Sequence, residues 1–213
     1  MIFLLLNRAY STSSKNWLSR QAKDPYCKLA KANQYRARSA FKLIQINDKY
    51  RILRRNDVVI DCGAAPGGWT QVAVEKVSKK GLVIGIDLLH VDPIPHAHLI
   101  QGNFMQTKTQ DEIHHILQGR SVNLVCSDMA PSFSGNHIAD HAHSMELCES
   151  ALSFAEKVLS PGGSFVAKFL MGGTEHEFRK KLKSLFAKVK TEKPDASRKQ
   201  STEGFFVALG YKG

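Results

Sequence analysis

The chain has 213 residues, which is enough for one full α/β domain and leaves little for a second. Thirty Lys and Arg against nineteen Asp and Glu give a net charge of +11, which favours a polyanionic partner. A basic organelle protein that contacts no nucleic acid would have the same charge, so this alternative stays open. Every apolar run is shorter than a membrane-spanning helix, and we expect no membrane insertion.

The first twenty residues are basic, contain a cluster of hydroxyl side chains from Ser11 to Ser14, and have no acid. This composition is typical of an organelle transit peptide, whereas a secretory signal needs a longer apolar run preceded by positive charge. A basic tail without a targeting role is the alternative. We expect residues 1–20 to be a mitochondrial transit peptide, residues 21–213 to form one domain, and the protein to reside in the matrix.

The next segment predicts a basic helix over about residues 34–50, where apolar side chains recur near helical spacing. Arg36, Arg38 and Lys42 can share one sector of this helix, and no acid lies between them. We therefore expect these side chains to be unpaired with acids and available to phosphates, although a solvated helix face is the common alternative.

Strand-like and helical patterns alternate from residue 58 onwards, which indicates a mostly parallel sheet with helices on both faces. Pro161-Gly162-Gly163 is expected to end the helix around 143–159. The strands are expected at 58–62, 82–88, 98–100, 122–127, 164–170 and 205–209, and the helices around 67–78, 109–118, 143–159 and 175–187.

The four cysteines are scattered, and none forms a C-x-x-C pair. Cys62 and Cys126 lie inside apolar strands, so we expect them to be buried thiols that behave as small hydrophobic side chains. This pattern indicates a reducing compartment and not a disulfide framework. The remaining two are Cys27 and Cys148.

The first strand runs into Gly63-Ala64-Ala65-Pro66-Gly67-Gly68 and then into a helical pattern. Such a loop allows a ligand to approach the backbone, and the helix N-terminus favours negative ligand atoms. Ala65 stands where a dinucleotide fingerprint needs its second glycine, so a pyrophosphate fits poorly. A cofactor with one ribose, one base and an amino-acid tail fits better, which means S-adenosylmethionine.

Polar residues also fall at four successive strand ends, at Asp61, Asp87, Asn103 and Asp128. Ligands of open parallel sheets bind beyond these carboxyl ends, and an acid that ends the second strand commonly receives a ribose diol. Each residue alone could be a helix cap or a turn former.

Several motifs occur in one order along the chain and resemble the FtsJ/RrmJ family of ribosomal RNA 2′-O-methyltransferases over residues 24–212. They are Asp-Cys-Gly-Ala-Ala-Pro-Gly-Gly-Trp-Thr-Gln, Ile-Asp-Leu-Leu, Gln-Gly-Asn-Phe, Ser-Asp-Met-Ala-Pro-x-x-Ser-Gly and Ser-Arg-Lys-Gln-Ser-x-Glu. The resemblance implies a Rossmann-like class I methyltransferase fold that depends on S-adenosylmethionine. Its seven-stranded, mostly parallel sheet is flanked by helices, and its last strand is antiparallel. The sixth strand, near 187–191, is weak by pattern.

The resemblance also assigns the cofactor site. It implies that Asp87 holds the ribose and that Asp128 lies near the methyl-bearing sulfonium. Asn103 stands where bacterial members usually carry Asp, but an amide can still exchange a donor and an acceptor with the adenine edge. The residues that line the cofactor are Gly63, Pro66, Gly67, Gly68 and Trp69.

Lys42, Asp128, Lys168 and Glu203 match the catalytic Lys-Asp-Lys-Glu tetrad of the family. Lys168 lies inside an apolar strand, and a lysine buried beside a second cation can act as a base. We expect Lys168 to take the proton of a ribose hydroxyl and Asp128 to orient it, while Lys42 and Glu203 position the ribose. Taken singly, Lys168 could instead reach solvent from a strand end, and Glu203 could be a turn acid.

Two further clusters bear on the partner. The spacing of His137, Asp140, His141 and His143 could suggest a metal site, but no cysteine joins them, so we expect no metal and a substrate-facing loop.

The last third of the chain is rich in lysine and arginine and could bind RNA phosphates, without a visible aromatic stacking platform. These basic residues are Arg179, Lys180, Lys181, Lys183, Lys188, Lys190, Lys193, Arg198 and Lys199.

Together these features predict a monomeric enzyme that methylates a ribose 2′-hydroxyl of rRNA, or of a large ribosomal subunit precursor. Within the family, the short chain and transit-like start resemble mitochondrial members that methylate a uridine of large-subunit rRNA. A methyltransferase for a small molecule or a protein is one alternative, but it would need neither a charge of +11 nor Lys42. A ribosome-assembly factor that uses the same fold with little catalytic role is the other.

Overall fold

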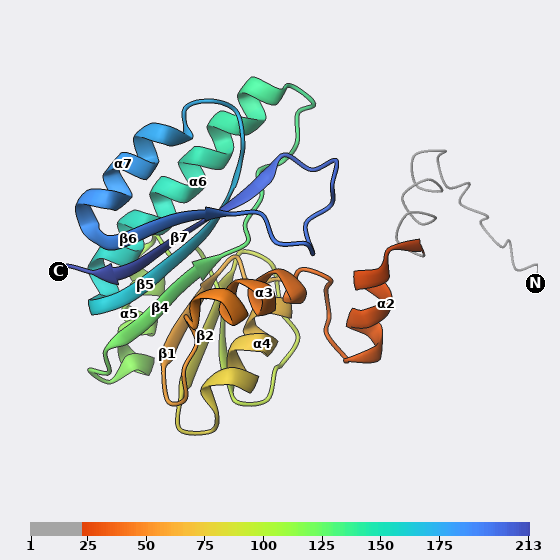
Figure 1. Ribbon diagram of the computed structural model, residues 1–213. Coiled ribbons are helices and arrows are strands. Elements are labelled where there is room, and N and C mark those ends of the chain that lie inside the picture. The colour runs from red at the N-terminus through yellow and green to blue at the C-terminus, as the bar shows by residue number, and fades with distance from the viewer. Residues whose placement is uncertain (1–22) are drawn as a thin grey trace, which may run out of the picture.

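The computed structural model describes residues 23–213, so the predicted transit peptide at 1–20 lies outside the described residues. Seven strands form one sheet in the order β3-β2-β1-β4-β5-β7-β6 (Figure 1). Neighbouring strands from β3 to β5 run parallel, and β7 runs antiparallel to both β5 and β6, which confirms the predicted fold. The strands are β1 (Val58–Cys62), β2 (Leu82–Asp87), β3 (Ala97–Gln101), β4 (Val122–Ser127), β5 (Leu159–Leu170), β6 (Phe186–Glu192) and β7 (Glu203–Tyr211).

Helices cover both faces of this sheet because the strands bury side chains in both directions. Along β1, Val58 and Ile60 pack with the core beneath α5, α6 and α7, whereas Val59 packs with the core beneath α3 and α4. Figure 1 shows α6 and α7 on one side of the strands and α3 and α4 on the other. The helices are α2 (Pro25–Ala32), α3 (Ala40–Tyr50), α4 (Gly68–Val77), α5 (Thr107–Leu117), α6 (His137–Val158) and α7 (Glu175–Leu185).

The N-terminal helical segment differs from the prediction of one helix over 34–50. Gln34 has a left-handed backbone (φ 60°), which breaks the segment, and α3 begins only at Ala40. The preceding helix α2 was not predicted, although Asp24 caps it through Tyr26 N and Pro25 occupies its first turn. This combination of an N-cap acid and an N-terminal proline is a recognised helix start.

Two boundaries near β5 were also predicted wrongly. Helix α6 begins at His137 and not at 143, because the Asn136 side chain accepts hydrogen bonds from Ile138 N and Ala139 N. Pro161-Gly162-Gly163 does not end this helix. It lies inside β5, where the pairing with β4 shifts register between Val122 and Leu124.

The weak sixth strand forms as β6, at the edge of the sheet beside β7. Only Phe186 and Val189 of this strand are buried, so its sequence shows little apolar alternation. Exposed lysines at Lys188 and Lys190 suit an edge strand because they oppose pairing with another chain. The strand therefore depends on its long pairing with β7 rather than on its own pattern.

The buried thiols are as expected at Cys62 and Cys126, and Cys148 is also buried. Burial raises the pKa of the Cys148 thiol to about 12, so this group stays protonated. Its Sγ donates to the carbonyl oxygen of Lys168 at 3.0 Å and so helps to hold β5 in place. Among residues 23–213, none of the helices combines the length and the apolar character needed to cross a bilayer.

Candidate active site

The loop between β1 and α4 is shaped by glycines that have no room for a side chain. Gly63 has φ +79°, and a Cβ there would lie 2.1 Å from Met129 Cγ. Gly67 has φ +114°, and its Cβ would lie 2.7 Å from Ile94 Cδ1. Helix α4 starts immediately afterwards, and the first N–H groups of a helix have no partner within it. The loop therefore ends in a site suited to a negative ligand group.

Arg36 stabilises the β1–α4 loop through hydrogen bonds to backbone carbonyl oxygens. Its Nη1 donates to the carbonyl oxygens of Pro66 at 3.2 Å and Asp92 at 2.7 Å, and its Nη2 donates to that of Pro93 at 2.8 Å. The guanidinium thus joins the β1–α4 loop to the connection between β2 and β3. Arg36 is exposed and no ion pair with an acid is seen among residues 23–213, so its contact with RNA phosphates stays a prediction, while its charge alone could not have revealed this backbone role.

Asp87 and Asn103 stand at the ends of β2 and β3, on the same edge as the loop. Asp87 Oδ2 accepts from Ala65 N and Oδ1 accepts from Leu89 N, both at 2.8 Å. Asn103 Oδ1 accepts from Met105 N at 2.9 Å. Each of these oxygens can accept a second hydrogen bond, so both side chains can receive a ligand while they shape their own turns.

Trp69 is placed differently from the other predicted cofactor residues. Its side chain is 3% exposed, its ring packs 5.7 Å from the Phe205 ring, and its Nε1 donates to Ser39 O at 2.8 Å. The indole therefore links α4 to the residue before α3 and to β7. Its contact with the cofactor stays a prediction.

Asp61 lies behind the loop, fully buried, and accepts a hydrogen bond of 2.7 Å from Thr70 Oγ1 on α4. Burial raises the pKa of Asp61 to about 7, although the hydrogen bond from Thr70 lowers it. The negative charges of Asp128 and Asp87 raise it further. Asp61 thus joins β1 to α4 and is not itself a ligand-facing group.

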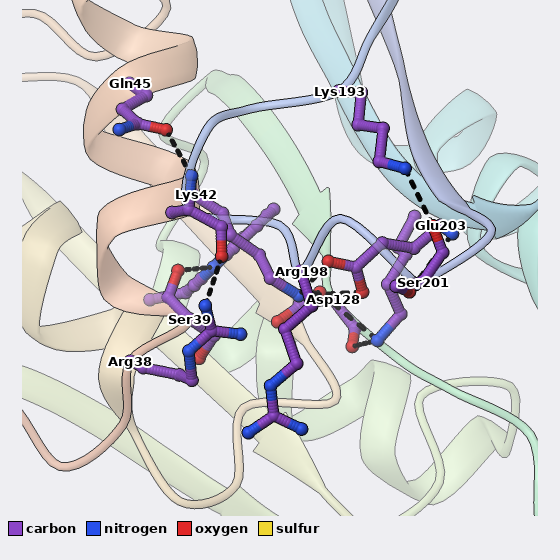
Figure 2. A network of polar contacts seen from close by, with 12 residues as sticks. Arg38, Ser39, Lys42, Gln45, Asp128, Lys193, Arg198, Ser201 and Glu203 are labelled. Atoms are coloured by element: carbon purple, nitrogen blue, oxygen red, sulfur yellow. Dashed lines mark hydrogen bonds and ion pairs between the residues drawn. The ribbon is translucent and has the colours of Figure 1, made fainter. Parts of the chain in front are cut away.

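The four residues of the predicted tetrad converge in the structure, and Figure 2 labels three of them, Lys42, Asp128 and Glu203. Lys168 Nζ, from β5, lies 3.2 Å from Asp128 Oδ1 and donates to the Asp128 carbonyl oxygen at 2.6 Å. Lys42 Nζ, from α3, lies 3.4 Å from the same Oδ1 and 3.0 Å from both carboxylate oxygens of Glu203, at the start of β7. Two cations and two anions therefore form one continuous cluster.

Burial controls the electrostatics of this cluster. The side chains of Lys42 and Lys168 are 7% and 9% exposed, so water screens their interactions weakly. Burial by itself would raise the pKa of Glu203, but several favourable interactions, of which the positive charge of Lys42 is the largest, together hold the pKa below its usual range. Glu203 is therefore an ionised partner for Lys42 at neutral pH.

The connection between β6 and β7, residues 193–202, holds the Glu203 side of the cluster against α3. Ala196 N donates to Gln45 Oε1 at 2.9 Å, and Arg38 Nη2 donates to Ala196 O at 2.7 Å. Asp24 Oδ2 lies 3.0 Å from Arg38 Nε and 3.4 Å from Arg198 Nε. Arg38 and Lys42 are thus paired with acids, contrary to the expectation from sequence, and Asp24 is a contributor that sequence reasoning missed.

The predicted substrate-facing loop at 137–143 is instead the first turns of α6. His141 is buried, with Nδ1 2.5 Å from the Leu170 carbonyl oxygen and Nε2 2.6 Å from Thr174 Oγ1. It braces the end of the strand that carries Lys168. In the described part of the chain, residues 23–213, no group of three or more His, Cys, Asp or Glu side chains is arranged to hold a metal ion.

Comparison with known proteins gives a consistent result. The model of a family described as FtsJ-like methyltransferase matches residues 35–211. Ribosomal RNA large subunit methyltransferase E of Acinetobacter baylyi is 44% identical over 208 residues, which cover 98% of this chain and 96% of the relative. The protein of the same name from Granulibacter bethesdensis is 44% identical over 212 residues, covering 100% and 91%. A Plasmodium falciparum crystal structure, named as a ribosomal RNA methyltransferase, aligns at TM-score 0.75 and 33% identity, covering 84% of this chain and all of that one.

Proposed function

The chain belongs to the FtsJ-like methyltransferase family, and on that premise we propose that it transfers a methyl group from S-adenosylmethionine to a ribose 2′-hydroxyl of large-subunit rRNA. The observation that carries the proposal is the buried cluster of Lys42, Asp128, Lys168 and Glu203 beside a glycine-shaped loop. The relatives named as large-subunit rRNA methyltransferases and the net charge of +11 support RNA as the acceptor.

The residues at the carboxyl edge fit S-adenosylmethionine. The N-terminus of α4, at Gly67 and Gly68, suits the carboxylate of the methionine moiety. Asp87 can accept from the ribose hydroxyls with its remaining lone pairs, and Asn103 can pair with the adenine edge. When bound, this cofactor supplies a methyl group activated by its positively charged sulfur.

Lys168 is proposed as the base. In its neutral form, Nζ takes the proton of the 2′-hydroxyl while the 2′-oxygen forms its bond to the methyl carbon and the bond from that carbon to sulfur breaks. The carboxylate of Asp128 at 3.2 Å and its carbonyl oxygen at 2.6 Å then hold the new ammonium group. Lys42 and Glu203 position the ribose, and holding the two reactants in line supplies much of the rate.

The sequence is the basis for assigning the acceptor nucleotide, the oligomeric state and the location of the enzyme. We propose that the acceptor is a uridine of mitochondrial large-subunit rRNA, or of its assembling subunit, and that the enzyme acts as a monomer in the matrix. The basic, hydroxyl-rich and acid-free composition of residues 1–20 supports the location.

The acceptor atom can be identified directly. The full chain is incubated with methyl-labelled S-adenosylmethionine and either a large-subunit rRNA transcript or the isolated subunit, and the RNA is then hydrolysed in alkali. We expect the label in alkali-resistant dinucleotides, because alkaline cleavage requires a free 2′-hydroxyl. Label in methylated bases would contradict ribose chemistry. Depletion of the protein without loss of any ribose methyl from mitochondrial rRNA would favour the assembly-factor alternative.

A further inference from the structure

Strand β5 loses one of its two neighbouring strands just before it reaches the tetrad. Its pairing with β4 ends where Ala167 lies opposite Ser127, whereas its pairing with β7 continues as far as Leu170. The chain leaves β4 at Asp128, whose carbonyl oxygen and carboxylate both contact Lys168 Nζ. Lys168 therefore lies in a stretch of β5 that has a strand along one edge only.

Side chains of α6 bind backbone groups of β5 along this stretch. Cys148 Sγ donates to Lys168 O at 3.0 Å, and Ser144 Oγ accepts from Leu170 N at 2.9 Å. His141 Nδ1 lies 2.5 Å from Leu170 O, and it must be the donor because a carbonyl oxygen only accepts. Buried backbone groups without partners would destabilise the strand. Helix α6 thus takes the place of β4 as the hydrogen-bonding neighbour of this stretch.

The three side chains form one stripe along α6. His141, Ser144 and Cys148 are spaced i, i+3 and i+7, which places them on one face of the helix. They are buried, and the same spacing continues with Ala151 and Ala155, which pack in the apolar core. The stripe is therefore polar where β5 lacks a neighbouring strand and apolar beyond it.

The stripe acts on Lys168 from the face of the sheet opposite to the tetrad. Val166, two residues before Lys168, packs in the core beneath α3 and α4, and side chains two apart in a strand share a face. Figure 1 shows α6 on the other side of the strands. The stripe contacts the backbone of β5 and leaves the Lys168 side chain to the tetrad, so it can affect Nζ only by fixing the backbone that carries it.

We propose that His141, Ser144 and Cys148 are positioning residues for methyl transfer. By holding the backbone of β5, they set where Lys168 Nζ lies relative to Asp128. This proposal rests on the proposed function, because these residues act through its proposed base. A misplacement of about 1 Å can lower a rate roughly 100-fold, so hydrogen bonds that never touch the substrate can control the chemical step.

Single-turnover transfer to pre-bound RNA at saturating cofactor tests this role in the full chain. We expect Ser144→Ala, which leaves Leu170 N buried without a partner, to lower the transfer rate roughly 10- to 100-fold. The dissociation constants of RNA and cofactor should stay at their wild-type values. Cys148→Ala should lower the rate about three- to tenfold, and Cys148→Ser should recover it, because a hydroxyl also donates to Lys168 O.

Hydrogen exchange of backbone amides separates a local effect from a general loss of stability. In Ser144→Ala the Leu170 amide should exchange faster, while the Val125 amide in β4 keeps its wild-type protection. Ala155→Gly is the matched control, because it weakens α6 on the apolar part of the stripe and should keep the wild-type transfer rate.

The possible results distinguish this proposal from the proposed function. A wild-type transfer rate in Ser144→Ala, with faster exchange of the Leu170 amide, would overturn the positioning role and leave the proposed function intact. Equally slow transfer in Ala155→Gly would assign the effect to stability and also overturn the positioning role. A wild-type chain that transfers no methyl group to RNA would overturn the proposed function, and this proposal with it.

Discussion

The two halves of the proposed active site are assembled from the chain in different ways. The cofactor half comes from successive segments, β1, its loop, β2 and β3, and the contact between Ala65 and Asp87 spans 22 residues. The acceptor half joins α3, β4, β5 and β7, and the contact between Lys42 and Glu203 spans 161 residues. The first half is encoded by a local motif, whereas the second exists only once the whole sheet has formed.

Removal of the proposed base should give the largest effect and should separate the two halves. We expect Lys168→Ala to lower single-turnover methyl transfer by roughly 100- to 10,000-fold, the usual contribution of a general base, while cofactor affinity stays close to wild type. Lys168→Arg should be equally slow, because a guanidinium keeps the charge but does not release its proton at neutral pH.

Isothermal titration of the cofactor and rapid-quench transfer on pre-bound RNA measure the two quantities independently. Lys79→Ala, in the exposed turn between α4 and β2, is the control and should match the wild type. Loss of cofactor binding with unimpaired single-turnover transfer would remove Lys168 from the base role.

The same contrast explains what could be predicted from sequence. β1 and β4 were predicted with their observed bounds, because continuous apolar runs bounded by Gly and Asp identify buried strands. The tetrad was predicted only through resemblance to a family, since no local pattern links Lys42 to Glu203. The backbone contacts of Arg36 could not be predicted, because a charge pattern cannot show that a guanidinium binds backbone carbonyls.

Asp61 tests how far the cofactor half depends on one buried acid. In the folded chain its pKa is about 7, whereas the ordinary value is 3.8, so between these pH values the folded state binds a proton that the unfolded state does not. Stability should therefore fall as the pH rises from about 4 to about 7 and then level off. Asp61→Asn should remove this slope, a difference on the order of 4 kcal/mol across the window.

Chemical denaturation of both proteins at a series of pH values measures this slope. Thr70→Val, which removes the hydroxyl that binds Asp61, is a useful companion because it should lower stability and preserve a pH dependence of the same sign. Parallel pH profiles for the wild type and Asp61→Asn would contradict a raised pKa at this residue.

Asp87 should affect the cofactor half alone. Asp87→Asn keeps the shape of the side chain but replaces one acceptor with a donor that faces Ala65 N or Leu89 N. Loss of hydrogen bonds to a charged group should weaken cofactor binding roughly 10- to 100-fold. At saturating cofactor the KM for RNA should not change, and an equal rise in both constants would show that the two halves are not separable.

Asp24 offers the smallest and most specific test of the acceptor half. Asp24→Asn keeps the cap on α2 but removes the charge between Arg38 and Arg198, which leaves two guanidinium groups facing each other. The 193–202 connection should then hold Glu203 less firmly against Lys42, and kcat should fall about three- to tenfold with unchanged cofactor affinity. Adding Arg198→Gln should restore part of the rate, because it relieves the repulsion, and a double-mutant cycle measures this coupling.

Glu149→Gln, which removes an exposed ion pair with Lys181, is the matched control. If the double variant is slower than Asp24→Asn by the full effect of Arg198→Gln alone, the two residues act independently and Asp24 does not position the loop.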